Sequence, residues 1–425
     1  MKKQFGQIFR LLLLNACLML NACQSKSVTV APSAAPAPTE TAVPNEIPAI
    51  ATATPSATPS FPVRWSYQTG GAVWGAPTIS DGVVCFGSDD HNLYAVEEQT
   101  GLLKWKFATQ GLVRSRPAIV DGLVYFTSDD GYLYAADAQS GNQAWRVDIG
   151  NFSESEKREN PGTNPDPSGF DYLQSSPTAA DDQIYVGSAD GNVYALAANT
   201  GNINWMFQTT QKVRATPTVD GGIVYIGSWD GTVYALDALT GQARWQTPIG
   251  GQIQTTALVA NGLVYTASRK ASVVALDAQT GEKIWEYDYG RNMWVESSPQ
   301  LVGTLIYIGS SGNQYVLGLD SQTGELLTAY TDKVFFWSTP VINGNMLYIG
   351  AASFPQNPAV GGLFGLEIPS YGNPLPIKLK WHLLVAETLM PDGNWAGVAS
   401  SPIVIDGVIY FGGLDGKLYA VAPQP

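Results

Sequence analysis

A unit of 40 residues recurs along this chain of 425 residues, and the repeat constrains the fold more than any other feature of the sequence. The unit is clearest from Tyr234 to Trp245, which reads YALDALTGQARW. Tryptophans mark successive copies with spacings of 40, 40, 60, 40 and 40 residues, at Trp65, Trp105, Trp145, Trp205, Trp245 and Trp285. A repeat of this length in a chain rich in β-branched and aromatic runs indicates a propeller or an array of blades.

Each copy is predicted to contain four short antiparallel strands, which together make one blade of a propeller. In the fourth copy we expect these strands at 216–219, 223–228, 233–237 and 243–246. The first turn of a copy often carries a pair that suits a type I′ hairpin, in which both central residues need positive φ. These pairs are Asp81-Gly82, Asp121-Gly122, Asn261-Gly262, Asn343-Gly344 and Asp406-Gly407.

The fold class predicted from the repeat is an all-β, eight-bladed propeller. The core of the third strand occurs eight times, at Tyr94, Tyr134, Tyr194, Tyr234, Val274, Leu317, Phe364 and Tyr419. The last copy ends before its outer strand, whereas the strand around Trp65 precedes the first copy and has no unit of its own. We therefore expect the strand around Trp65 to complete the eighth blade and close the ring, which removes exposed sheet edges. An open solenoid is the alternative.

The N-terminal segment is predicted to be an export signal, since a basic start precedes an apolar run that is too short to span a membrane. Residues 1–22 form this signal peptide, which ends in Leu20-Asn21-Ala22 before Cys23. That ending resembles the bacterial lipobox, which implies that Cys23 is acylated and becomes the first residue of the mature protein. An ordinary signal peptide with incidental cysteines is the alternative.

Residues 23–60 are rich in Pro, Ala, Thr and Ser, so they bury too little apolar surface to fold and are predicted to form a disordered tether. The propeller then occupies residues 61–425, with an insertion at 151–172. The formal net charge of −13 argues against nucleic-acid binding, which relies on a basic patch. A closed acidic ring gives no reason to expect more than a monomer.

The motif Ala235-Leu-Asp237, Thr240-Gly241 and Trp245 resembles the repeat of the pyrroloquinoline quinone (PQQ) enzyme family, and the resemblance covers about residues 61–425. In that family the repeat tryptophan docks one blade against the next. This role is implied here for Trp65, Trp105, Trp145, Trp205, Trp245, Trp285 and Trp381. Members include quinone-dependent dehydrogenases, sensor or adhesion modules, and BamB-type lipoproteins that assist outer-membrane protein assembly; the lipobox and the lone propeller are most similar to the last.

An enzymatic role is not expected from the residues present. The resemblance implies that a quinone site would usually lie over two adjacent, disulfide-linked cysteines, but the predicted propeller contains only Cys85, in an apolar run. We interpret Cys85 as a buried, inert thiol. The two histidines, His91 and His382, lie in separate copies and form no cluster typical of zinc sites. We therefore predict no catalytic residues, no metal site and no PQQ or Ca²⁺.

A candidate site follows from the start of each inner strand, where a small residue usually precedes proline. Strand alternation places the residues one and three before that proline on the same side, toward the central funnel. The ring three before reads Trp74, Arg114, Gln174, Arg214, Gln254, Glu296, Trp337 and Ala399, while the ring one before is small except for Arg116. Arginine and tryptophan suit an anionic or aromatic group. Alternatively, Arg114 or Arg214 pairs with Glu296 or with backbone carbonyls, and the tryptophans plug the channel.

The loops between blades are expected on the same face, and they bring Trp294, Phe336 and Trp395 to the candidate partner face. Exposed aromatic residues are enriched at protein interfaces, although these side chains could equally pack over the blades. The preferred hypothesis is a non-enzymatic, lipid-anchored scaffold that binds an envelope protein, with outer-membrane protein assembly as one role. It would lie on the periplasmic face of the outer membrane, or outside the cell membrane in a host with a single membrane. The alternatives are a PQQ-dependent alcohol or sugar dehydrogenase and a propeller that binds a small or glycan ligand.

Overall fold

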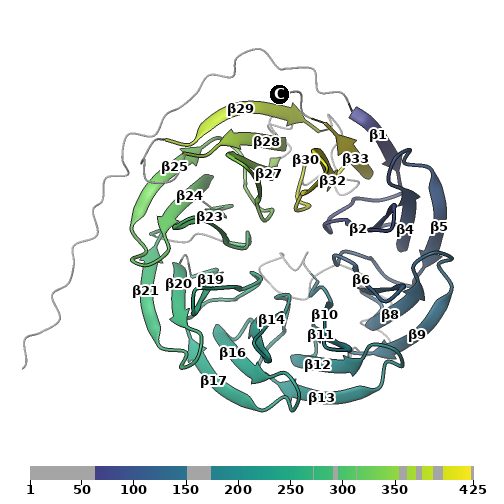
Figure 1. Cartoon of the computed structure of the whole chain (residues 1–425), viewed down its shortest axis with the longest axis horizontal. Helices are drawn as coiled ribbons and strands as arrows, with labels where there is room; N and C mark the ends of the chain where they lie inside the picture. The colour runs from purple at the N-terminus through teal and green to yellow at the C-terminus, as the bar shows by residue number, and fades with distance from the viewer. Residues whose placement is uncertain are drawn as a thin grey trace, which may run out of the picture. The chain divides into compact units, whose positions relative to one another are not determined.

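The computed structural model describes residues 63–150, 174–270, 272–290, 295–312, 314–353, 361–369, 376–385 and 396–422. Within these residues the chain forms eight sheets that surround a central axis as the blades of a propeller (Figure 1). The predicted fold class is therefore confirmed. The predicted signal peptide, tether and insertion lie outside the described residues, as does Cys23. No helix long and apolar enough to cross a membrane occurs in the described part of the chain.

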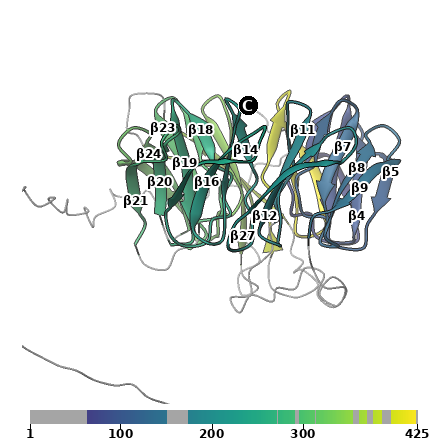
Figure 2. The ribbon, with the colours of Figure 1, turned by 90° about the horizontal axis from the view of Figure 1, so that it is seen from below.

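Each blade is an antiparallel sheet, and in the first seven blades the strands follow chain order from the axis outward (Figures 1 and 2). The first four blades are β2 (Thr78–Ser80), β3 (Val83–Ser88), β4 (Asn92–Glu97) and β5 (Leu103–Ala108); β6 (Ala118–Val120), β7 (Leu123–Thr127), β8 (Tyr132–Asp137) and β9 (Gln143–Asp148); β10 (Thr178–Ala180), β11 (Gln183–Gly187), β12 (Asn192–Ala197) and β13 (Ile203–Gln208); and β14 (Thr218–Asp220), β15 (Ile223–Gly227), β16 (Thr232–Asp237) and β17 (Ala243–Pro248).

The other four blades follow the same plan with one addition. They are β18 (Leu258–Ala260), β19 (Leu263–Ser268), β20 (Ser272–Asp277) and β21 (Lys283–Asp288); β22 (Gln300–Val302), β23 (Leu305–Gly309), β24 (Tyr315–Asp320) and β25 (Leu326–Thr331); β26 (Val341–Asn343), β27 (Met346–Ser353), β28 (Gly362–Glu367) and β29 (Lys378–Leu384); and β31 (Ile403–Ile405), β32 (Val408–Gly412), β33 (Lys417–Val421) and β1 (Val63–Gln68). The addition is β30 (Ala396–Gly397), which pairs with the end of β27.

The last blade takes its outer strand from the N-terminal end of the ring. Strand β1 pairs antiparallel with β33, in a register that places Tyr67 opposite Leu418 and Ser66 opposite Tyr419. The blade therefore joins two segments that are far apart in the sequence.

The turns between the first two strands of each blade explain the regular spacing of glycine. Asp81 and Gly82 both have positive φ, at 49° and 73°, as a type I′ turn requires. The expectation for Asn343-Gly344 is wrong, because Asn343 pairs with Met346 and ends β26. The two-residue turn there begins at Gly344, one position later than expected.

The hydrophobic core lies between the blades rather than in one central cluster. One cluster joins Tyr185 and Val193 of the third blade to Val224, Ile226 and Leu236 of the fourth. The middle strands are buried on both faces, as in β15 and β16, whereas the outer strands alternate between exposed and buried residues. Because each sheet is covered by its neighbours, the strands carry nearly continuous apolar runs.

The repeat tryptophans connect each blade to the next. The Trp205 indole N–H donates a hydrogen bond of 2.9 Å to the carbonyl of Ala238. A Cβ on Gly241 would lie 2.6 Å from the Trp205 ring, so the turn at Gly241 requires glycine for close approach as well as for its φ of 72°. The equivalent indole bonds join Trp65 to Glu98, Trp105 to Ala138, Trp145 to Ala198, Trp245 to Ala278 and Trp285 to Ser321.

Trp381 of the seventh blade packs beside a tyrosine of its own blade, as Trp205 packs beside Tyr185. A Cβ on Gly365 of the same blade would meet the Trp381 ring, and Tyr348 lies 5.5 Å from that ring. Trp381 shares a buried cluster with Ile409 and Val421 of the last blade, so it still lies at an interface between blades.

Candidate functional site

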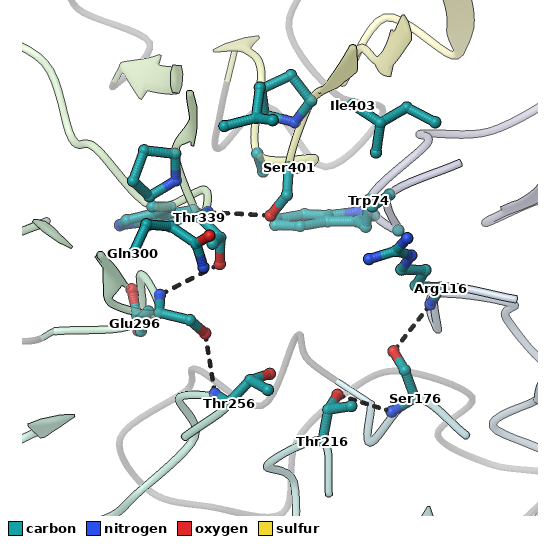
Figure 3. Close-up of a pocket in the computed structure, with 18 of the residues that line it drawn as sticks. Trp74, Arg116, Ser176, Thr216, Thr256, Glu296, Gln300, Thr339, Ser401 and Ile403 are labelled. Carbon is teal, nitrogen blue, oxygen red and sulfur yellow. Dashed lines mark hydrogen bonds between the residues drawn. The ribbon is translucent and has the colours of Figure 1, made fainter. Parts of the chain in front are cut away.

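A cavity of about 600 Å³ lies where the inner strands meet around the axis (Figure 3). Its volume is in the range that small-molecule ligands occupy. The cavity is lined by the ring three residues before each proline and by the ring one residue before it, including Trp74, Arg114, Arg116, Arg214, Glu296 and Trp337. The wall continues along the inner strands with Thr78, Ile79, Leu258, Gln300 and Ile405. The register of the X-Pro steps thus brings both predicted rings to one cavity.

Two tryptophans on different blades meet at this cavity. The rings of Trp74 and Trp337 are stacked, with centroids 6.2 Å apart and planes inclined by 21°. Trp74 is buried and its indole N–H donates a 3.0 Å hydrogen bond to Asp89. The pair therefore forms a fixed aromatic surface at the lining of the cavity.

Arg114 is held by an acidic residue that the sequence analysis did not select. Its Nε and Nη2 donate hydrogen bonds of 2.7 and 2.9 Å to the two carboxylate oxygens of Asp89. Its guanidinium also lies 5.3 Å from the centre of the Trp74 ring. Because both partners are largely buried, this bidentate pair fixes the orientation of Trp74 more than it attracts a ligand.

Glu296 is likewise paired with a residue outside the predicted rings. Arg269 donates a 3.0 Å bond to its carboxylate, and it also donates to Gln252 and Gln254 at 2.8 and 3.1 Å. Its guanidinium lies 5.7 Å from the centre of the Trp229 ring. The alternative in which Glu296 pairs with Arg114 is therefore wrong, since each has its own partner on another turn.

The partners Asp89 and Arg269 belong to a third ring that the sequence analysis missed. They occupy the same position in their copies, directly after a buried serine in the turn that follows the second strand, as do Asp129 and Trp229. The backbone N–H of each donates to the carbonyl of the residue that lies two positions before Trp74 or its equivalent in another copy. The bond from Asp89 to Ala72 and the bond from Arg269 to Gln252 are both 2.9 Å long. The sequence did carry a sign of this third ring: in the Ser-x-Asp-Gly turn and its variants, the residue at position x differs between copies while the residues on either side repeat.

Arg116 is the charged residue of the ring nearest the proline. Its Nε donates a 3.3 Å hydrogen bond to the Thr78 hydroxyl, and its side chain is exposed to the cavity (Figure 3). Although the side chain is accessible, it lies deep in the ring, and burial lowers the pKa of its guanidinium. Arg214 also lines the cavity and is partly buried.

A belt of hydroxyl groups accompanies Arg116 around the axis. The backbone N–H of Arg116 donates to Ser176 Oγ at 2.9 Å, and the N–H of Ser176 donates to Thr216 Oγ1 at 3.1 Å. On the other side of the ring, the same pattern runs from Thr256 to Ser298, from Ser298 to Thr339 and from Thr339 to Ser401, at 2.9, 3.2 and 2.9 Å. Each hydroxyl oxygen accepts from the backbone of the preceding blade, so the belt links neighbouring blades.

The structure does not place every predicted residue at this face. Phe336 is fully buried, and its ring packs 6.1 Å from Tyr330 and 5.3 Å from Phe364, so its prediction as a partner-face residue is wrong. It precedes Trp337 of the ring and therefore points into the sheet interface. Trp294 and Trp395 lie outside the described residues.

The remaining chemically active side chains lie away from the cavity. Cys85 is fully buried, and burial raises the pKa of its thiol to about 12, in agreement with an inert thiol. His382 stacks on Phe364 with ring centroids 4.1 Å apart, and burial lowers its pKa to about 4. Over the described ranges, no group of three or more His, Cys, Asp or Glu residues could hold a metal ion.

Comparison with known sequences identifies one family. The model of the family described as outer membrane protein assembly factor BamB matches four overlapping segments, at residues 62–159, 153–257, 189–357 and 248–424. Together they span the whole repeat region. No curated protein matches the chain.

Solved structures with the same fold include an assembly factor and enzymes. BamB from Moraxella catarrhalis is 22% identical, with a TM-score of 0.57 over 67% of this chain and 84% of that one. The quinohemoprotein alcohol dehydrogenase ADHIIG from Pseudomonas putida HK5 is 15% identical, with a TM-score of 0.62 over 85% and 77%. A europium-containing methanol dehydrogenase is 14% identical, with a TM-score of 0.64 over 85% and 93%. These identities establish a shared fold, which hosts both binding and catalysis.

Proposed function

Because this chain belongs to the PQQ-repeat propeller family described as outer membrane protein assembly factor BamB, we propose that it is a non-enzymatic envelope lipoprotein that binds a protein partner. The observation that carries this proposal is the family match, which extends over the repeat region from residue 62 to residue 424. The predicted lipobox supports it, since a single propeller on a tether at Cys23 suits a scaffold that acts close to a membrane. The partner we propose is a component of outer-membrane protein assembly.

The charged residues of the funnel also favour binding over catalysis. Arg114 and Glu296 are each held by a buried ion pair, to Asp89 and Arg269, so both are occupied by contacts within the protein rather than presented to a substrate. We further propose that the chain takes neither PQQ nor Ca²⁺. Cys85 supports this proposal, because it has no adjacent cysteine and its buried thiol has a pKa raised to about 12.

The localisation proposed is a lipid anchor at Cys23, on the periplasmic face of the outer membrane if the host has two membranes and otherwise outside the cell membrane. Substitution of Cys23 by serine removes the acylation site. We expect wild-type chain in the membrane fraction of the host and Cys23→Ser chain in the soluble envelope fraction. Recovery of both in the membrane fraction would refute lipid anchoring through Cys23.

The partner is tested by crosslinking the full chain in intact host cells and purifying it with the subunits of the outer-membrane assembly machinery. We expect the membrane-embedded barrel subunit of that machinery to co-purify with the chain. If only unrelated proteins are recovered, the assembly role is wrong.

Titration with PQQ, with and without Ca²⁺, tests the non-enzymatic assignment separately. We expect no binding on folded protein. Micromolar binding of PQQ, accompanied by dye-linked oxidation of an alcohol or sugar, would show that the chain is a dehydrogenase and that the scaffold proposal is wrong.

A further inference from the structure

Arg116 lines the cavity and pairs with no carboxylate among the described residues. Arg116 makes a single side-chain hydrogen bond among the described residues, through Nε to Thr78, and the Thr78 hydroxyl itself donates to the carbonyl of Pro117 at 2.6 Å. Among the described residues that line the cavity, Glu296 is the only one with a carboxylate, and Arg269 already holds it. Figure 3 places Arg116 and Glu296 on different sides of the cavity. The outer edge of the Arg116 guanidinium is therefore available to an anion in the lumen.

The hydroxyl belt supplies further donors at the same level as Arg116. In the belt, Ser176, Thr216, Ser298, Thr339 and Ser401 accept a backbone hydrogen bond, and no hydrogen bond donated by these hydroxyls occurs among the described residues. A hydroxyl group is both donor and acceptor, so each retains a proton that can rotate toward a ligand. The belt therefore presents donors on several sides of the lumen, which matches a ligand rich in acceptor oxygens.

We propose that the funnel binds a small organic monocarboxylate that also carries hydroxyl groups, with its carboxylate on Arg116 and its remaining oxygens on the serine and threonine belt. A planar guanidinium matches a planar carboxylate. Arg116 can balance the charge of one carboxylate, and each further negative charge on the ligand would be added to an already acidic protein. The cavity of about 600 Å³ holds a ligand of sugar size beside the Trp74 and Trp337 rings. This site is separate from the proposed protein partner, and its test does not depend on that partner.

The experiment is calorimetric titration of the full chain with D-glucuronate and with D-glucuronamide, which replaces the carboxylate by a neutral amide of the same size. We expect glucuronate to bind at least about tenfold more tightly, because a hydrogen-bonded charge is lost in the amide. Inorganic phosphate is the third probe, and we expect it to bind more weakly than glucuronate.

Two variants connect binding to Arg116. Arg116→Gln removes the charge from a side chain that is exposed to the cavity, so the fold should persist, and we expect at least about a tenfold loss of glucuronate affinity. Arg116→Lys keeps the charge but not the planar guanidinium, so its affinity for glucuronate should lie between those of the wild type and Arg116→Gln. Arg244→Gln is the matched control, since Arg244 is exposed on the outer strand β17 and should leave affinity unchanged.

The proposal is overturned if folded protein gives no heat with glucuronate up to about 10 mM, well above a Kd of weak but specific binding. It is equally overturned if glucuronamide binds as tightly as glucuronate, if phosphate binds more tightly, or if Arg116→Gln binds like wild type. Thermal unfolding of each variant establishes that a loss of affinity is not a loss of fold.

Discussion

His382 should make the stability of the propeller depend on pH in a range where few other groups titrate. It lies on β29, stacked on Phe364, and its Nε2 is buried without a hydrogen-bond partner among the described residues. Burial lowers its pKa from 6.5 to about 4, although Asp332 acts in the opposite direction. The folded protein therefore resists protonation of this imidazole, while the unfolded chain accepts the proton readily.

The sign and size of the effect follow from these two pKa values. Between pH 6.5 and 4 the unfolded chain binds more protons, so stability is lost as the pH falls through this range. From pH 7 to pH 5 the free energy of unfolding should fall by about 2 kcal/mol through His382. The hydrogen-bonded carboxyl of Asp237, with a pKa of about 2, contributes above pH 4 and loses its contribution only at lower pH.

Urea unfolding at pH 7 and pH 5 measures this difference. His382→Phe keeps an aromatic ring against Phe364 but does not titrate, so it should abolish most of the drop. His91→Gln removes the other histidine of the chain and should leave the drop in place. The reasoning is refuted if His382→Phe loses as much stability as wild type between the two pH values, or if wild type loses less than about 0.5 kcal/mol.

Two further predictions concern packing and charge. Gly241→Ala should lower the free energy of unfolding in urea by about 1–3 kcal/mol more than Gly222→Ala does. Both glycines have positive φ, but only Gly241 faces an indole ring, that of Trp205. Equal losses would mean that the Trp205 ring does not pack tightly against Gly241. Arg114→Ala should destabilise by about 3 kcal/mol, since it leaves the Asp89 carboxylate buried, whereas Arg244→Ala breaks an exposed pair and should cost less than about 1 kcal/mol in the same measurement. A loss at Arg114 no larger than that at Arg244 would contradict the assigned ion pair.

The fold was predictable because most copies of the repeat carry the same local signals. An Asp-Gly or Asn-Gly pair often marks the first turn, a Thr-Gly or Ser-Gly pair often marks the third, and in the regular copies the tryptophan follows the third-strand core by a constant distance. The inner strand begins later than predicted in the fourth blade, at Thr218 rather than at residue 216. Pro217 explains the difference, since it has no backbone N–H to donate to the ladder.

The two rings of the cavity were also predictable, since strand alternation from a proline of known position orders the side chains that precede it. Their ion pairs were not predictable, because Asp89 and Arg269 reach the ring residues Arg114 and Glu296 from turns between the second and third strands of a blade. Only the three-dimensional path of the hairpin brings Asp89 within 2.7 Å of Arg114 on the next blade. Charge complementarity among ring residues alone suggested the wrong partner for Glu296.

The burial of Phe336 could have been predicted from the same alternation of side chains along the strand. Wherever the structure describes the residue before a ring position, that residue is fully buried, at Val73, Val113, Val213, Ile253, Val295, Phe336 and Val398. Its side chain fills the gap left by a glycine of the second strand, as Ile253 does against Gly227 and Phe336 against Gly309. Aromatic character suggested an interface residue, but position in the repeat decides its environment.

The positions of the repeat that stay constant between copies show which of the varied positions are not needed for packing. The buried residue before the ring, the docking tryptophan and the turn glycines recur because the blades would not pack without them. The ring position beside them is under no such restriction, and it carries tryptophan, arginine, glutamine, glutamate or alanine in different copies. Two residues after the ring position, the belt keeps a hydroxyl residue in six copies, has alanine in one, and has an arginine only at Arg116. Among the described residues, the Arg116 side chain joins the blades by a single 3.3 Å hydrogen bond, from Nε to Thr78 of the preceding blade. That bond needs no arginine, so the charge of Arg116 is best explained by something that enters the funnel.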